Sequence, residues 1–252
     1  MMKKTLVFSL LLATSQSNAM QCDVDLKNDI RVNEQRVEVN QGDGKKAVFD
    51  QEGNLSIAGY KVVLNEEQKK ALEGYRNDIN DNITKAQDMT QSGLKLVDKI
   101  IQDVSSSFKI EGSLDGVTKS VHQFYSDIES RYRDKGDLIL PANLLSDWQE
   151  NGAAELSRLT DLIDKEFTTD IFEAMSTKMK NEGGLNLSEL ATTMSDLKAR
   201  VSKDFADHQK NIEDQAKKMC ESLQGSAKAE QDLHQKIPQL ANYSIFNLEE
   251  KH

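Results

Sequence analysis

Two cysteines and four histidines are the residues of this chain that metal binding or nucleophilic catalysis would use first. The histidines are His122, His208, His234 and His252. None has the HxxxH, HxxE or cysteine–histidine spacing of a zinc site, and His208 falls on an apolar helical stripe, where a hydrogen-bonded histidine is commoner than a ligand. Neither Cys22 nor Cys220 has a CxxC partner or a neighbouring histidine. This pattern disfavours both a metal site and thiol catalysis.

Other sequence patterns that carry catalysis are also missing. The chain contains no GxSxG or protein-kinase motif. The glycine-rich stretch at 42–44 precedes neither GKS/GKT nor a helix start, so we interpret it as a turn rather than a phosphate loop. Carboxylates such as Asp161, Asp164 and Glu166 are expected in a chain with 42 acidic residues, and they indicate a solvated helix face. We predict a protein that is not an enzyme and has no catalytic, cofactor-binding or metal-binding residue.

The charge balance limits the classes of partner. The chain has 252 residues, with 32 lysines and arginines against 42 acidic residues, and a formal charge of -10. Nucleic-acid binding needs clustered basic residues, so we expect no nucleic-acid partner. The one basic and aromatic cluster, at 131–133, is neutralised by Glu129 and Asp134. A mean hydropathy of -0.62 excludes a multi-span membrane protein.

Residues 1–19 have the three parts of a secretory signal peptide. Lys3 and Lys4 supply the basic start, an apolar run follows, and the small residues Ser17 and Ala19 suit the peptidase site. A short membrane anchor is the alternative, but the apolar run of about eight residues is far below the ~20 that a span needs. No later segment approaches that length, so we expect no membrane span in the mature chain. The mature protein is predicted to be soluble and exported to the periplasm.

Export gives the two cysteines a structural interpretation, because an even pair in an oxidising compartment indicates a disulfide. Cys22 lies near the start of the mature chain and Cys220 near its end. A bond between them would close a loop of roughly 200 residues and, in the chain-entropy model, contribute up to about 5 kcal/mol. The alternative is two unrelated buried thiols. We predict a structural disulfide between Cys22 and Cys220 that fixes the N-terminal segment to the last long helix.

Residues 20–64 are expected to form a β-rich N-terminal piece. Short β-branched and apolar runs alternate there with turns rich in glycine, asparagine and aspartate, a pattern typical of β-meander hairpins. The runs cover residues 37–39, 47–49, 55–57 and 60–63. An isolated hairpin is only marginally stable, so one face of this small sheet must pack on helices. Further along the chain, Leu138–Leu140 ahead of Pro141 indicates an extended piece or an edge strand.

Residues 65–225 are predicted to form a helical domain. Its first helix begins with Asn65 and Gln68 as a capping box and keeps apolar residues at a mean step of ~3.6 to position 108. Gly93 interrupts this helix, either to bend it or to permit close packing. Three more helices cover residues 114–132, residues 148–179 with a stop at Gly183–Gly184, and a stretch from Asn186 to a stop at Gly225.

Together these elements predict an α+β protein, mainly α, with a small N-terminal antiparallel β-meander packed on long antiparallel helices. The apolar stripes of the helices are typical of a bundle core with coiled-coil-like packing. A closed bundle and an open helical arm both remain possible at this point. Residues 226–252 form a polar C-terminal tail, whose apolar stretch at 243–248 either docks back or stays mobile.

Several segments, in this order, resemble the YggN family of uncharacterised bacterial periplasmic proteins. They are Gln21–Cys22 after the signal, the hairpin Asp50–Leu55 with Gly59, Leu64–Gln68 leading to Tyr75, the run Leu96–Ile101, and Cys220. The resemblance covers most of the mature chain and implies a periplasmic protein with paired cysteines and no assigned activity. It transfers no catalytic residue.

The leading hypothesis is a scaffold or chaperone-like protein of the cell envelope, whose partner is another envelope protein. Long amphipathic helices, a high solvated charge and the missing catalytic patterns favour it. The alternative is a binding module for a small apolar or lipid-like ligand. Methionines suit such a pocket because their side chains adapt to irregular shapes; the five concerned are Met89, Met175, Met179, Met194 and Met219.

Overall fold

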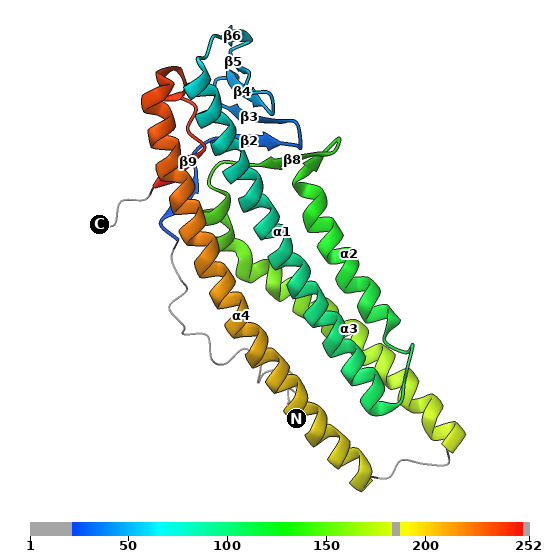
Figure 1. Ribbon diagram of the computed structural model, residues 1–252. Coiled ribbons are helices and arrows are strands. Elements are labelled where there is room, and N and C mark those ends of the chain that lie inside the picture. The colour runs from blue at the N-terminus through cyan, green and yellow to red at the C-terminus, as the bar shows by residue number, and fades with distance from the viewer. Residues whose placement is uncertain (1–21, 183–186, 249–252) are drawn as a thin grey trace.

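The computed structural model describes residues 22–182 and 187–248 of the chain (Figure 1). Three predictions lie outside the described residues: the signal peptide at 1–19, the helix stop at Gly183–Gly184 and the helix start at Asn186. Within them, the structure confirms an α+β protein, mainly α, with an N-terminal antiparallel sheet followed by long helices. The sheet lies at one end of the molecule, and the helices extend away from it (Figure 1).

Most strands belong to one antiparallel sheet with the order β6-β5-β4-β3-β2-β8-β7. They are β2 (Asp29–Val32), β3 (Arg36–Asn40), β4 (Lys46–Asp50), β5 (Leu55–Ile57), β6 (Tyr60–Val62), β7 (Arg133–Asp134) and β8 (Asp137–Leu140). Strands β2 to β6 pair in chain order, which confirms the predicted meander. The extended piece expected at 138–140 is β8, which lies between β2 and β7 rather than at the edge.

The sheet buries apolar side chains on one face and carries charged side chains on the other, because side chains alternate between the two faces of a strand. Phe49 lies on the buried face, where its ring centroid is 6.1 Å from that of Tyr75. On the opposite face, the Arg31 guanidinium pairs with Asp134 at 2.8 Å and with Asp137 at 3.2 Å. These ion pairs connect β2 to the β7–β8 hairpin, which follows it by about 100 residues in the chain.

Four long helices follow in the described residues: α1 (Glu66–Phe108), α2 (Asp115–Arg131), α3 (Leu144–Glu182) and α4 (Leu187–Lys236). The capping box of α1 is confirmed, since the N–H of Gln68 donates to the Asn65 side chain at 2.9 Å and the reciprocal bond is 3.0 Å long. Helix α1 packs along α4, and α2 packs along α3 (Figure 1). Helix α1 continues through Gly93, where a Cβ would lie 3.4 Å from the Tyr125 hydroxyl oxygen, an ordinary contact distance.

Two clusters of buried side chains divide the molecule into regions that we call the head and the arm. The head core lies between the sheet, the first turns of α1 and the last turns of α4, and it includes Val37, Phe49, Leu72 and Leu233. The arm core lies between the helices farther from the sheet, and it includes Val104, Val117, Val121 and Leu197. The head therefore combines strands and helix ends, whereas the arm is helical only.

The helix end predicted at Gly225 is wrong, because α4 continues to Lys236. Ala227, Leu233 and Ile237 extend its apolar stripe and are buried in the head core. A glycine inside a helix costs about 1 kcal/mol relative to alanine. Burying a leucine or isoleucine side chain gains about 1.5–3 kcal/mol, so the tertiary contacts outweigh the local preference of Gly225.

The C-terminal tail docks on the head as far as it is described. After α4, the short helix η1 (Pro238–Leu240) turns the chain, and β9 (Phe246–Leu248) pairs antiparallel with β1 (Val24–Leu26). Tyr243, Ile245 and Phe246 are buried in the head core. Of the two alternatives for this tail, docked or mobile, the structure shows the docked one.

Gly225→Ala is expected to stabilise the protein by about 0.5–1 kcal/mol, because Gly225 is helical and a Cβ there meets no atom within 4 Å. Gly59→Ala is the matched control. A Cβ at Gly59 also meets open space, but its φ of +83° strains alanine, so this variant should lose about 1 kcal/mol. Urea unfolding of both variants measures whether each substitution raises or lowers the free energy of unfolding. A loss of stability in Gly225→Ala would indicate that the helix ends at this glycine.

Candidate functional site

The disulfide predicted between Cys22 and Cys220 is present in the structure. The two Cα atoms are 5.5 Å apart, inside the range of native disulfides, and no cysteine of the described chain is free. Cys220 is buried in α4, and Cys22 packs against the head core two residues before β1. The bond therefore fixes the N-terminal strand to the longest helix of the protein.

Asp25 connects the same strand to the start of α3. One carboxylate oxygen accepts hydrogen bonds from the N–H groups of Leu26 at 2.7 Å and Leu145 at 2.9 Å. The other accepts from the N–H of Ser146 at 3.1 Å and from its hydroxyl. Burial by itself would raise the pKa of Asp25, but the bonds from Ser146, Leu145 and Leu26 together lower it below 3.8. A charged carboxylate thus satisfies the free N–H groups that begin a helix.

Near the other end of the chain, the side chain of Glu230 also connects separate elements. Its buried carboxylate accepts hydrogen bonds from the Tyr75 hydroxyl at 2.5 Å, the N–H of Ile245 at 2.6 Å and the N–H of Phe246 at 3.1 Å. Burial raises the pKa of Glu230, although these three bonds and the charge of Lys27 oppose the rise. Burial and the Glu230 carboxylate raise the pKa of Tyr75 well above 10.0. Helix α1, helix α4 and the segment entering β9 therefore meet at one side chain.

We call the group formed by Cys22, Asp25, Tyr75, Cys220 and Glu230 the terminal junction. The side chains of its five residues are all engaged in a covalent bond or a hydrogen bond within the protein. Buried polar groups that are fully paired rigidify a fold, and they offer no open position to a substrate. The terminal junction therefore supports a structural role, not a catalytic one.

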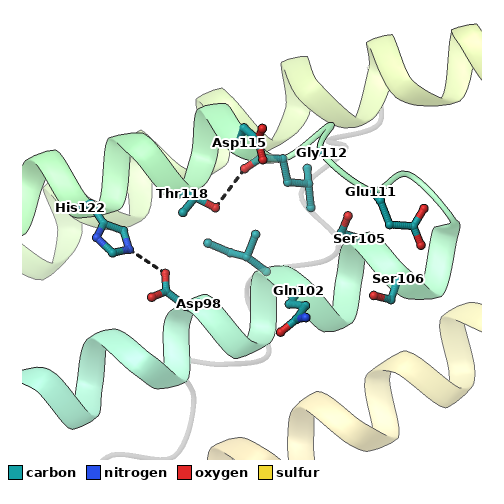
Figure 2. A pocket seen from close by; sticks show the side chains of 11 residues that line it. Asp98, Gln102, Ser105, Ser106, Glu111, Gly112, Asp115, Thr118 and His122 are labelled. Atoms are coloured by element: carbon teal, nitrogen blue, oxygen red, sulfur yellow. Dashed lines mark hydrogen bonds and ion pairs between the residues drawn. The ribbon is translucent and has the colours of Figure 1, made fainter.

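A separate polar hollow of about 350 Å³ lies between α1 and α2, near the turn that joins them (Figure 2). Asp98, Gln102 and Ser105 line it from α1, and Thr118 and His122 line it from α2. Sequence patterns missed this cluster, because its members are up to 24 residues apart and meet only through the pairing of two helices. Only the assembled helical hairpin could have revealed it.

The hollow contains a histidine–carboxylate pair. The Nε2 atom of His122 is 2.9 Å from Oδ1 of Asp98 (Figure 2), and the two side chains are 46% and 40% exposed. No nucleophile is bonded to this imidazole among the described contacts, since the Ser105 hydroxyl donates to the carbonyl of Ile110 at 3.1 Å. Within the described residues, no group of three or more histidine, cysteine, aspartate or glutamate side chains could hold a metal ion.

Exposed large apolar side chains occur on both the head and the arm. In the head, Tyr60 is 80% exposed and Val63 is 91% exposed. Phe172 on α3 is 74% exposed, and Met194 on α4 is 41% exposed. The arm therefore has exposed apolar side chains on both α3 and α4.

The other residues considered from the sequence lie apart from one another. Met219 packs against the head core, whereas Met194 lies 25 residues away in the same helix, about 37 Å along its axis. The side chains of Met175 and Met179 lie outside the described residues. Met194 and Met219 therefore share no ligand pocket.

Charged residues expected on solvated surfaces are found there. Asp161 and Asp164 are exposed on α3, as predicted for a solvated helix face, and Glu166 is half-buried. Arg131 pairs with Glu155 at 2.9 Å and Arg133 with Glu129 at 2.8 Å, which neutralises the basic cluster. These residues support no basic binding surface.

Comparison with known proteins gives a family and no closer relative. The model of the family described as "Protein of unknown function (DUF2884)" matches residues 22–246, most of the chain. No curated protein and no solved structure matches the chain. Among the helices of the described residues, none combines the length and the apolar composition needed to cross a membrane.

Cys22→Ser and Cys220→Ser should each lower the free energy of unfolding by about 2–5 kcal/mol, because each removes the same cross-link. The double variant should lose no more than either single one. Chemical unfolding of the oxidised proteins measures this, and peptide mapping without reductant verifies the bond. Equal unfolding midpoints for the native protein with and without reductant would contradict a stabilising role.

Asp25→Asn should destabilise the protein by about 1–3 kcal/mol at pH 7. The variant has an amide NH2 group in place of a carboxylate oxygen that accepts hydrogen bonds from α3. The folded-state pKa of Asp25 is depressed, so its stabilising effect is present above pH 3.8 and is lost as the pH falls through the folded-state value. The difference in the free energy of unfolding between the native and Asp25→Asn proteins should therefore become smaller in acid. Asp81→Asn, at an exposed position of α1, is the control and should match the native stability at pH 7. A difference between the native and Asp25→Asn proteins that does not change with pH would contradict this role.

Proposed function

The chain belongs to the DUF2884 family, and we propose that it is an exported cell-envelope protein that holds another polypeptide on its helical arm. In this proposal it acts by binding, as a scaffold or a chaperone-like holder, and not as an enzyme. The observation that carries the proposal is the exposure of two large apolar side chains on the arm helices, Phe172 on α3 at 74% and Met194 on α4 at 41%.

The head has the properties of a rigid support. Its sheet, the end of α4 and the docked tail share one core, and the disulfide and two buried carboxylates connect these parts. Such a support keeps the arm in one orientation without contributing to binding. Preorganisation of this kind lowers the entropy lost when a partner is bound.

The arm has the properties of a binding surface. Its helices carry apolar side chains that are only partly buried, and Phe172 is 74% exposed. Exposed apolar surface on a protein chain is typical of sites that contact other proteins. Aromatic side chains in particular act as anchors of such contacts.

Export to the periplasm is the second part of the proposal. The signal-like residues 1–19, the resemblance to the YggN family and the disulfide support it, because disulfides persist in oxidising compartments. The partner in that setting is another protein of the envelope.

Photo-crosslinking in intact cells tests this function. Benzoylphenylalanine in place of Phe172 should yield adducts with other envelope proteins, since this position is exposed on the arm. Tyr60 is the matched control, because it is an aromatic residue of the head with a similar exposure of 80% against 74%. Adducts at position 172 and none at position 60 would support the proposal. Equal yields at both positions, or none at either, would contradict it.

A second readout uses the purified protein. It should suppress the aggregation of a reduced, unfolding client protein at stoichiometric concentration, because the arm covers apolar surface of the client. Phe172→Ala should weaken this suppression, while Tyr60→Ala should leave it unchanged. Full suppression of aggregation by the Phe172→Ala variant would show that the Phe172 side chain does not bind the client.

A further inference from the structure

The last described residues of the chain lie on the head in the manner of a bound peptide. We call residues 242–248, which include β9, the strap. The strap packs on α4, and its β9 part adds one strand to β1 (Figure 1). Extended peptides bind other proteins in the same way, by adding a strand through main-chain hydrogen bonds and placing side chains in apolar pockets.

The head holds the strap through main-chain groups of the strap. The Glu230 carboxylate accepts hydrogen bonds from the N–H groups of Ile245 and Phe246, at 2.6 and 3.1 Å. The N–H of Lys27 donates to the carbonyl oxygen of Ile245 at 2.8 Å. Three successive main-chain groups of the strap are thus bonded to the head beside the β1–β9 pairing.

Two side-chain amides of the head add further main-chain bonds. Asn28 donates to the carbonyl oxygen of Ser244 at 2.8 Å, and Gln41 donates to that of Asn242. We call the four head residues that make these bonds, together with the paired edge of β1, the strap site. Because almost every residue type supplies an N–H and a carbonyl group, this part of the recognition does not depend on the sequence of the strap.

The buried side chains of the strap supply the selectivity. Tyr243, Ile245 and Phe246 lie in the head core and are 7%, 1% and 8% exposed, whereas Asn247 is exposed. Burying each large apolar side chain gains free energy, and a polar residue at these positions would lose it. A segment that fits the strap site is therefore extended and has large apolar side chains at these three positions.

An exposed turn joins the strap to the rest of the chain. Leu240 is buried in the head core, whereas Ala241 and Asn242 are exposed. Rotation in these two residues therefore releases the strap, while β1 keeps its disulfide to α4 and the bonds between Asp25 and α3. Such an opening is a local unfolding that leaves the remaining fold in place.

We propose that the strap site is a second polypeptide-binding site, separate from the arm, and that the strap closes it. Its occupant is an extended segment of a partner protein with large apolar residues at the spacing of Tyr243, Ile245 and Phe246. The strap competes with that segment at a high effective concentration, because a two-residue turn tethers it. The segment therefore binds the closed protein weakly and binds more tightly once the strap is released.

The first test lengthens the tether and leaves the side chains of the strap and of the strap site unchanged. A 12-residue glycine–serine linker is inserted between Ala241 and Asn242 of the full mature protein. The effective concentration of the strap should fall about tenfold or more, because it decreases steeply with tether length. Fluorescence anisotropy should therefore show that a fluorescein-labelled peptide of residues 242–248 binds this variant about tenfold more tightly than the native protein.

The matched control has the same linker between Lys135 and Gly136, in the exposed turn of the β7–β8 hairpin, which is also in the head. Its affinity for the peptide should equal that of the native protein. A peptide with serine in place of Ile245 and Phe246 should bind none of the proteins.

A second variant weakens the strap itself. Phe246→Ala removes a buried aromatic contact of the strap, so the native-sequence peptide should bind this full-length variant about a hundredfold more tightly than it binds the native protein. Circular dichroism verifies that the linker and Phe246→Ala proteins are folded.

Three results would overturn the proposal. They are native affinity in the linker variant inserted at Ala241, an equal gain in the Lys135 control, and equal binding of the serine-substituted peptide. The first would show that the strap leaves only when the whole head unfolds, and the others would show unspecific binding to apolar surface. Since Phe172 takes no part in these measurements, crosslinking at position 172 tests the function of the arm separately.

Discussion

The short strand β1 is the element on which the other parts of the head depend. Three residues of this strand, together with the cysteine two positions before it, contact three separate elements. The disulfide connects to α4, the Asp25 carboxylate accepts hydrogen bonds from the start of α3, and the backbone pairs with β9. Val24 and Leu26 fill the head core between them. A segment this short has no stability of its own, so its position must come from these tertiary bonds.

This arrangement fixes one end of the long helices. A helical bundle usually derives its stability from a continuous apolar core along its length. Here the terminal junction and the head core fix the helices at the end near the sheet, and a second apolar cluster lies between them farther away. Exposed apolar surface is costly in water, and a protein that keeps it gains a place to bind another chain.

Local patterns in the sequence predicted local structure well. The Asn65–Gln68 capping box, the apolar periodicity of the helices and the turns of the meander depend on residues a few positions apart. Gly225 misled the prediction because a local preference of about 1 kcal/mol yields to the burial of the residues that follow it.

The disulfide was predictable from the cellular compartment that the first residues indicate. Asp25 and Glu230 were not, since both bind backbone N–H groups, which any residue type supplies, and the partners of Asp25 on α3 lie 120 residues away. The Asp98–His122 pair was missed for a similar reason, because it needs two helices in register.

Hydrogen–deuterium exchange before and after reduction of the disulfide tests the central role of β1 most directly. In the oxidised protein, we expect slow exchange in β1, β9, the first turn of α3 and the end of α4, and faster exchange in the parts of α3 and α4 far from the sheet. After reduction, protection should fall together in β1, β9 and the first turn of α3. The disulfide itself joins only the segment leading into β1 to helix α4, so the loss in β9 and α3 must be transmitted through β1. Unchanged protection of β9 and α3 after reduction would contradict the dependence of the head on this one strand.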